Sequence, residues 1–222
     1  MNSKYSSFLT VLLVIVIIAI VGILGFLGYR YYESVRTKNT SEDFVDTFLN
    51  DSNKDTNTTD QNTVSDDEWN VNVDGTNNTG SSASNVQKYE GFTVAGTIEI
   101  PATNLKCPII ARSEYSKSAL EKSVVEVYGV GLNQVGNTTI AGHNYRNGNF
   151  FSNNKRLNTG DKIYITDLTG KRVAYTIYSK YETSESDAEY MSRDTQGAVE
   201  ISLSTCTDDS KARLIILARA DG

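Results

Sequence analysis

The sequence predicts an all-β domain, closed into a barrel, that follows an apolar helix. From about residue 89 onward, roughly seven or eight short runs of β-branched and apolar residues alternate with turn residues, the spacing of a sandwich or small barrel. The chain has no second set of strands large enough for another sheet, which favours closure into a barrel. It also shows no internal repeat and no glycine-rich phosphate loop.

The N-terminal part of the 222-residue chain contains an uncharged apolar run, residues 8–29. As a helix this run is about 33 Å long, enough to cross a bilayer. Arg30 follows it directly and no small-residue cleavage site is present, so we predict an uncleaved anchor rather than a signal peptide. Lys4 precedes the span and three basic residues follow it within nine positions, so charge counting favours an N-terminus outside the cytoplasm.

The segment after the apolar run is polar and acidic. Residues 39–88 hold ten acidic residues against two basic ones, with a single apolar cluster at residues 44–49 in which we expect one short helical turn. So little apolar surface does not offset the entropy of ordering, and we predict a flexible tether over residues 30–88. Residues 89–222 form the predicted folded domain; with 15 basic and 16 acidic residues it has no basic surface for nucleic acid.

Within this domain the expected elements are short. The predicted strands are 96–101, 107–110, 138–142, 162–166, 171–181, 199–205 and 213–219, with a helix at 116–122 and a turn at 167–170.

The strand at 199–205 alternates strictly between apolar and polar residues, which puts Cys206 at a strand end on the polar side. The turn-like segment that follows leads into a returning strand, so Arg213 should lie near Cys206 at one end of a hairpin. Arg219 shares the face of Arg213 but lies about 20 Å further along the strand. Arg193, in a predicted loop, is a weaker candidate than Arg213 for the arginine near Cys206.

His143 is the only histidine, and it too stands where a predicted strand ends. A neighbouring imidazole activates a thiol and supplies a proton to a leaving group, and a guanidinium can hold a developing oxyanion. Two cysteines give no disulfide framework. Cys107 stands beside Pro108 in an apolar strand and is predicted to be a buried structural thiol.

These residues carry a resemblance to a known family. The segment Leu203-Ser204-Thr205-Cys206, the hairpin to Arg213, and Gly142-His143-Asn144 upstream resemble the sortases, the membrane-anchored cysteine transpeptidases of Gram-positive bacteria. The similarity covers roughly residues 91–220 and includes the segments 96–101 and 136–143.

The resemblance implies an eight-stranded sortase barrel with Cys206 as nucleophile, His143 as general acid and base, and Arg213 as stabiliser of substrate and oxyanion. Thr205, Ser204 and Asn144 are expected to contact substrate. No metal or cofactor is expected. The acidic segment 182–191 could bind Ca2+ as in some class A sortases, but without regular ligand spacing a solvated loop is favoured.

The implied reaction is cleavage of a C-terminal LPXTG-type sorting signal of a secreted protein through a thioacyl enzyme. The acceptor is an amine of lipid II or another peptidoglycan precursor; the alternative is a pilin lysine, in a pilin-polymerising sortase. The implied location is the cell membrane, crossed once, with residues 1–7 in the cytoplasm, residues 8–29 in the bilayer and the catalytic domain facing the cell wall. This topology is the reverse of the one that charge counting favours.

Other readings stay open. About sixteen residues separate the strands ending near 181 and starting near 198, too few for the long helix of class B enzymes, so a class D-like or class A-like sortase is favoured. Asp67-Glu68-Trp69 is only faintly similar to a pilin-sortase lid.

An L,D-transpeptidase would carry an arginine two residues after its cysteine, whereas here Arg213 follows Cys206 by seven residues. A non-enzymatic alternative is a tethered β-domain adhesin in which Cys206 is incidental.

Overall fold

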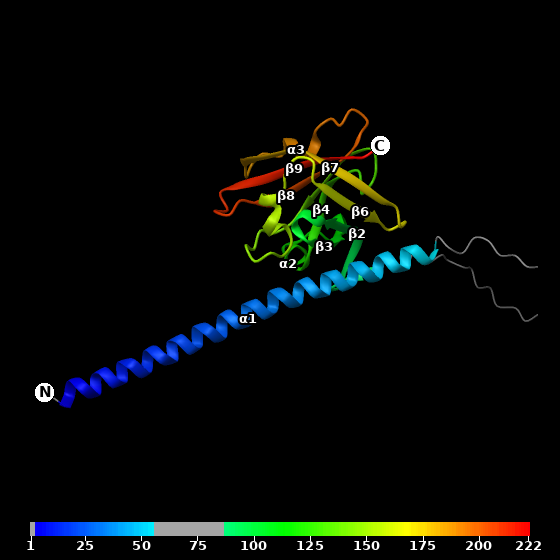
Figure 1. The fold of residues 1–222 in the computed structure, drawn as a ribbon. Helices are drawn as coiled ribbons and strands as arrows, with labels where there is room; N and C mark the ends of the chain where they lie inside the picture. The colour runs from blue at the N-terminus through cyan, green and yellow to red at the C-terminus, as the bar shows by residue number, and fades with distance from the viewer. Residues whose placement is uncertain (1–2, 56–86) are drawn as a thin grey trace, which may run out of the picture.

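The computed structural model describes residues 3–55 and 87–222, in which one long helix lies beside a β-barrel (Figure 1). The helix, α1, runs from Ser3 to Asp55. The elements that follow are β1 (Lys88–Tyr89), β2 (Phe92–Ile100), η1 (Pro101–Thr103), β3 (Leu105–Ile110), η2 (Arg112–Glu114), α2 (Lys117–Lys122), β4 (Val124–Gly129), β5 (Gly136–Ala141), η3 (Phe151–Arg156), β6 (Lys162–Asp167), β7 (Arg172–Ser184), α3 (Glu189–Ser192), β8 (Val199–Cys206) and β9 (Ala212–Ala220).

The strands β2 to β9 close on themselves, which confirms the predicted eight-stranded barrel. Their order is β2-β3-β4-β5-β8-β9-β7-β6, and β6 pairs back onto β2 from Gly96↔Asp167 to Glu99↔Tyr164. The two-residue β1 adds to the edge of β2. At the closure, a Cβ on Gly96 would lie 2.3 Å from the carbonyl oxygen of Thr166, so only glycine lets these two strands approach so closely.

The barrel interior is filled by the apolar face of each strand. Ile98, Ile109, Ile140 and Ile163 are fully buried in one continuous cluster. Tyr175 is buried among them and its hydroxyl donates a hydrogen bond to Oδ1 of Asn133 at 2.9 Å, which satisfies its polar end. The interior is thus a packed core rather than a cavity.

Strand β4 was not among the predicted strands. It pairs parallel to β3 through Ile109↔Val124 and antiparallel to β5 through Val125↔Ala141. Glu126 interrupts its apolar run, yet this side chain is only 7% exposed and burial raises the pKa of its carboxyl group. A buried carboxylate in the middle of a short strand conceals the strand from pattern analysis.

The prediction of a flexible segment beginning at residue 30 does not hold for residues 30–55, which continue α1. Ser41, Val45 and Phe48 recur at helical spacing and are buried, so this stretch has one face that packs on the barrel although most of its residues are polar. Residues 56–86 of the predicted tether, including Asp67-Glu68-Trp69, lie outside the described residues.

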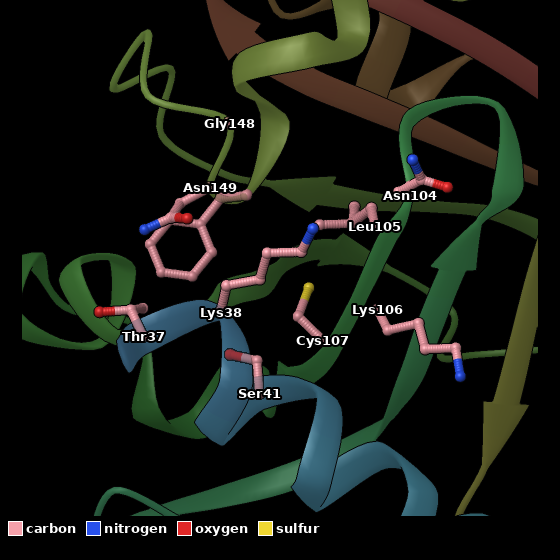
Figure 2. A pocket seen from close by; sticks show the side chains of 10 residues that line it. Thr37, Lys38, Ser41, Asn104, Leu105, Lys106, Cys107, Gly148 and Asn149 are labelled. Atoms are coloured by element: carbon pink, nitrogen blue, oxygen red, sulfur yellow. The ribbon is translucent and has the colours of Figure 1, made fainter. Parts of the chain in front are cut away.

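The helix α1 docks against β3 and the loop between β5 and β6. Ser41 shares a hydrogen bond with the hydroxyl of Tyr89 at 3.0 Å, and Lys106 pairs with Asp46 at 3.1 Å. Figure 2 shows Cys107 of β3 beside Ser41 of α1, where the thiol is only 1% exposed. Burial raises the pKa of Cys107 to about 12, which fits the inert structural thiol that was predicted.

We expect Val45→Asp to detach α1 from the barrel, because an unpaired charge at a buried site costs several kcal/mol. Detachment should uncover Cys107 and raise its alkylation rate by about tenfold or more. The measurement is iodoacetamide labelling of the full chain in a Cys206→Ala background, followed by mass spectrometry. Thr47→Asp places the same charge on an exposed face of α1 and serves as the control. Equal labelling of the two variants would contradict this docking.

Candidate active site

Two strands from distant parts of the sequence bring His143 and Cys206 to one edge of the barrel. β5 pairs parallel to β8 from Gly136↔Val199 to Ala141↔Ser204, and the backbone N–H of Gly142 donates to the carbonyl of Ser204 at 3.1 Å. His143 lies two residues beyond the last pair on β5, and Cys206 two residues beyond it on β8. The register therefore sets the imidazole and the thiol level with each other on neighbouring strands.

Arg213 lies directly opposite Cys206 in the antiparallel pairing of β8 with β9. Its Nη1 donates to the sulfur of Cys206, while its Nη2 pairs with the carboxylate of Glu185 at 2.8 Å. The structure thus brings together the thiol and the guanidinium that the hairpin predicted. The part played by Glu185 was missed; the only signal for it in the sequence was the acidic character of the segment 182–191.

Asn144 joins the histidine loop to the cysteine hairpin. Its Nδ2 donates to the carbonyl of Cys206 at 3.1 Å and to Oδ1 of Asp208 at 2.9 Å. Lys155 holds the other oxygen of Asp208 at 2.5 Å, and its hydrogen bond is the main cause that lowers the pKa of that carboxyl group. Asn144 was predicted to bind substrate; here its amide binds the chain segment that carries Cys206.

Ser204 and Thr205, the other two predicted substrate contacts, are buried. The Ser204 hydroxyl shares a hydrogen bond with the hydroxyl of Tyr190 in α3 at 3.1 Å. Thr205 is 3% exposed and lies on the inward-facing side of β8. Neither side chain is open to a bound peptide in this structure.

The outer face of β8 is covered by α3 through a buried ionic network. Glu200, 2% exposed, pairs with Arg193 at 2.6 Å and Arg219 at 2.7 Å and accepts a hydrogen bond from the Tyr178 hydroxyl at 2.8 Å. Burial raises the pKa of Glu200, but these hydrogen bonds outweigh it and leave the pKa below its usual value. Arg193 also donates to the carbonyl of Tyr190 at 2.9 Å, so it holds α3 in place instead of reaching Cys206.

His143 is half-buried, with its ring 4.9 Å from that of Tyr145 between centroids. Burial lowers the pKa of His143; Glu121 opposes this, and the charges of Arg213 and Lys117 lower the pKa further. At neutral pH the imidazole is therefore mainly the uncharged base. A Cβ on Gly142 would lie 2.8 Å from both Phe151 and Val124, so the chain reaches His143 through a position that admits only glycine.

The acidic side chains of the segment 182–191, for which a solvated loop was favoured over a Ca2+ site, have protein partners in this structure. Glu185 pairs with Arg213, and Asp187 accepts hydrogen bonds from the Thr183 hydroxyl and the Glu189 backbone. Within residues 3–55 and 87–222, no group of three potential ligands is placed to hold a metal ion. The expectation that no metal or cofactor is needed stays a prediction of the sequence.

Comparison with known proteins places these observations in a family context. The Sortase domain profile matches residues 98–221. The structure resembles a sortase A lid mutant from Corynebacterium diphtheriae, with 25% identity and a TM-score of 0.53 over 58% of this chain and 70% of that one. It shares its fold with Streptococcus agalactiae sortase C1 in complex with MTSET, with 23% identity and a TM-score of 0.51 over 57% of this chain and 66% of that one. It also shares its fold with sortase C-1 from Actinomyces oris, with 20% identity and a TM-score of 0.52 over 57% of this chain and 73% of that one. No curated protein sequence matches the chain.

The charges around His143 predict opposite responses to two substitutions. Arg213→Gln removes a positive charge and should raise the pKa of His143, whereas Glu121→Gln removes a negative charge and should lower it. The Hε1 resonance of the only histidine reports both in an NMR titration of the full chain. Lys171→Gln, an exposed change in the turn between β6 and β7, is the control. Shifts of the same sign in the first two variants would refute this electrostatic picture.

Proposed function

The chain belongs to the sortase family, and we propose that it is a membrane-anchored cysteine transpeptidase in which Cys206 is the nucleophile, His143 the general acid and base, and Arg213 the oxyanion stabiliser. The contact between Arg213 and the sulfur of Cys206, at the barrel edge that also bears His143, carries this proposal. A thiol, an imidazole and a guanidinium so arranged provide a nucleophile, a proton carrier and a fixed donor.

In the first half-reaction the Cys206 sulfur attacks the carbonyl carbon of the Thr–Gly bond in an LPXTG-type sorting signal. His143, mainly uncharged at neutral pH because burial lowers its pKa, accepts the thiol proton as the carbon–sulfur bond forms. The guanidinium of Arg213 donates to the oxyanion of the tetrahedral intermediate. The carbon–nitrogen bond then breaks, and the imidazolium gives its proton to the departing glycine amine, leaving a thioester on Cys206.

In the second half-reaction an amine attacks the thioester carbon. His143 takes a proton from the attacking amine, Arg213 again donates to the oxyanion, and the carbon–sulfur bond breaks. The proton on His143 returns to the departing sulfur, so the enzyme is regenerated and a new amide joins the two substrates. The proposed acceptor is the amine of a lipid-linked peptidoglycan precursor, with a pilin lysine as the alternative to be compared.

The proposed location follows from α1. Its apolar part, with mean hydropathy 3.2, is long enough to cross a bilayer, and none of it is buried against the barrel. We propose that the N-terminus is cytoplasmic and the barrel faces the cell wall, where sorting signals and precursors meet. The short connection between β7 and β8, which holds only the four-residue α3, supports a class A-like or class D-like enzyme.

We expect an LPXTG-type peptide to form a thioacyl adduct on Cys206, detected by intact-mass spectrometry of the full chain in detergent. Cys206→Ala should abolish the adduct, and His143→Ala should slow its formation by at least about a hundredfold, because no other imidazole is present to carry the proton. Cys107→Ala is the matched control and should leave the adduct unchanged, since that thiol is buried. If no adduct forms across a broad panel of sorting-signal peptides, the transpeptidase proposal is contradicted and the alternative of a tethered β-domain adhesin is favoured.

We expect Arg213→Lys to reduce kcat/KM by about a hundredfold or more, since one ammonium does not replace the planar paired donors beside Cys206. Arg219→Lys changes the same residue type on the same strand, at the pairing with Glu200, and should stay within a few fold of the parent rate. Peptide cleavage and transfer to a glycine-based amine are the measurements. A near-parental rate for Arg213→Lys would remove Arg213 from the mechanism.

A further inference from the structure

A cleft of about 500 Å³ lies where α1 leaves its apolar run, and the chemistry of its walls differs from that of the active site. Arg30 and Lys38 line it from α1, and Arg156 lines it from η3. Four asparagine residues complete much of the remaining wall, and no acidic residue contributes to it. The cleft therefore presents three positive charges and several amide donors to whatever enters it.

The basic side chains of this cleft are largely free of carboxylate partners. Lys38 reaches Glu42 only at 3.7 Å on an exposed surface. In the described ranges, 3–55 and 87–222, neither Arg30 nor Arg156 has a carboxylate within 4.0 Å. Unneutralised guanidinium groups in a concave site favour an anion with several oxygen acceptors, such as a phosphate.

The walls of the cleft are held in place by contacts between the helix and the barrel. The side chain of Asn149 donates to the carbonyl of Ser34 at 3.2 Å and accepts from the Ser34 hydroxyl at 3.4 Å. Figure 2 draws the smaller neighbouring pocket, which shares Lys38 and Asn149 with the cleft, and shows Lys38 extending from α1 between Asn149 on one side and Leu105 on the other. The site is thus built between two docked elements.

The position of the cleft along α1 places it at the membrane surface. Tyr29 ends the apolar run, and the headgroup layer is about 5–8 Å thick on each side, which at about 1.5 Å per residue spans roughly residues 30–34. Tyr31 and Tyr32 are 73% and 65% exposed, as in the aromatic belt of membrane helices. Arg30 and Ser34 therefore lie at the depth of the lipid phosphates, and Lys38 lies about one helical turn above Ser34 and about two above Arg30.

We propose that this juxtamembrane cleft binds the phosphate of an anionic phospholipid headgroup. The bound lipid would bridge α1 and the loop between β5 and β6, the loop that also carries His143 and the Asn144 and Lys155 contacts to the cysteine hairpin. The proposal rests on the membrane anchoring described above but on none of the cysteine chemistry. Lipid binding and thioester formation can therefore fail independently.

The test uses the full chain in nanodiscs of mixed phosphatidylglycerol and phosphatidylcholine, with retained lipids identified by native mass spectrometry. We expect phosphatidylglycerol to be enriched over its bulk fraction, and Arg30→Gln and Arg156→Gln each to reduce the enrichment by about tenfold or more, because each removes a charge-assisted hydrogen bond to the phosphate. Circular dichroism of each variant shows that the fold is retained.

Arg36→Gln is the control, because Arg36 lies between Ser34 and Lys38, within the length of α1 that lines the cleft, but faces Glu121 and Lys122 instead. If this variant loses as much enrichment as Arg30→Gln, general surface charge accounts for the effect and the cleft is not a site. In a second arm, inorganic phosphate is added to phosphatidylcholine nanodiscs. A thermal shift equal to that given by phosphatidylglycerol would identify a site for a free anion and overturn the headgroup assignment.

Discussion

The candidate active site depends on one interaction, the parallel pairing of β5 with β8. The two strands come from segments more than fifty residues apart, and six residue pairs fix their register. Because side chains alternate between faces, a slip of one residue would turn Cys206 from the outer face toward the core and bring Thr205 level with His143. The antiparallel pairing of β8 with β9 then adds Arg213 opposite Cys206. One central strand thus carries Cys206, the proposed nucleophile, and sets the positions of His143 and Arg213 beside it.

The same strand must bury polar groups on the side away from the core. Glu200, Ser202 and Ser204 are all under 9% exposed on the outer face of β8, and leaving such groups unpaired would cost a few kcal/mol each. Ser202 donates to Asn137 at 3.0 Å, Ser204 bonds to Tyr190, and Glu200 is held by two arginines. These bonds fix α3 and the connection from β7, which also positions Glu185 beside Arg213. The wall of the site is therefore held in place by a polar network rather than by apolar packing alone.

How much the sequence predicts depends on how local the signal is. The alternation at 199–205 and the turn after Cys206 are local, so the hairpin and the neighbouring Arg213 were predicted from residue pattern alone. The nearness of His143 depends on a parallel pairing that leaves no local signal, and it was expected from the family resemblance. The Asn144 and Glu185 contacts depend on loop conformations that no residue pattern specifies. In residues 30–55 the buried stripe of Ser41, Val45 and Phe48 was concealed among polar neighbours, and a helix was taken for a flexible tether.

The unbroken course of α1 has a consequence for how substrates meet this protein. From Tyr29 to Val45 the helix rises about 24 Å without interruption, and its upper part is fastened to the barrel (Figure 1). A domain on a flexible linker would reach a range of heights above the bilayer. A domain docked on a rigid helix stays at a constant height above it. Its encounters are then governed by lateral diffusion in the plane of the bilayer. The proposed lipid-linked acceptor would share that plane and meet the domain by two-dimensional diffusion, whereas a partner in free solution would have to reach the height of the active site above the bilayer.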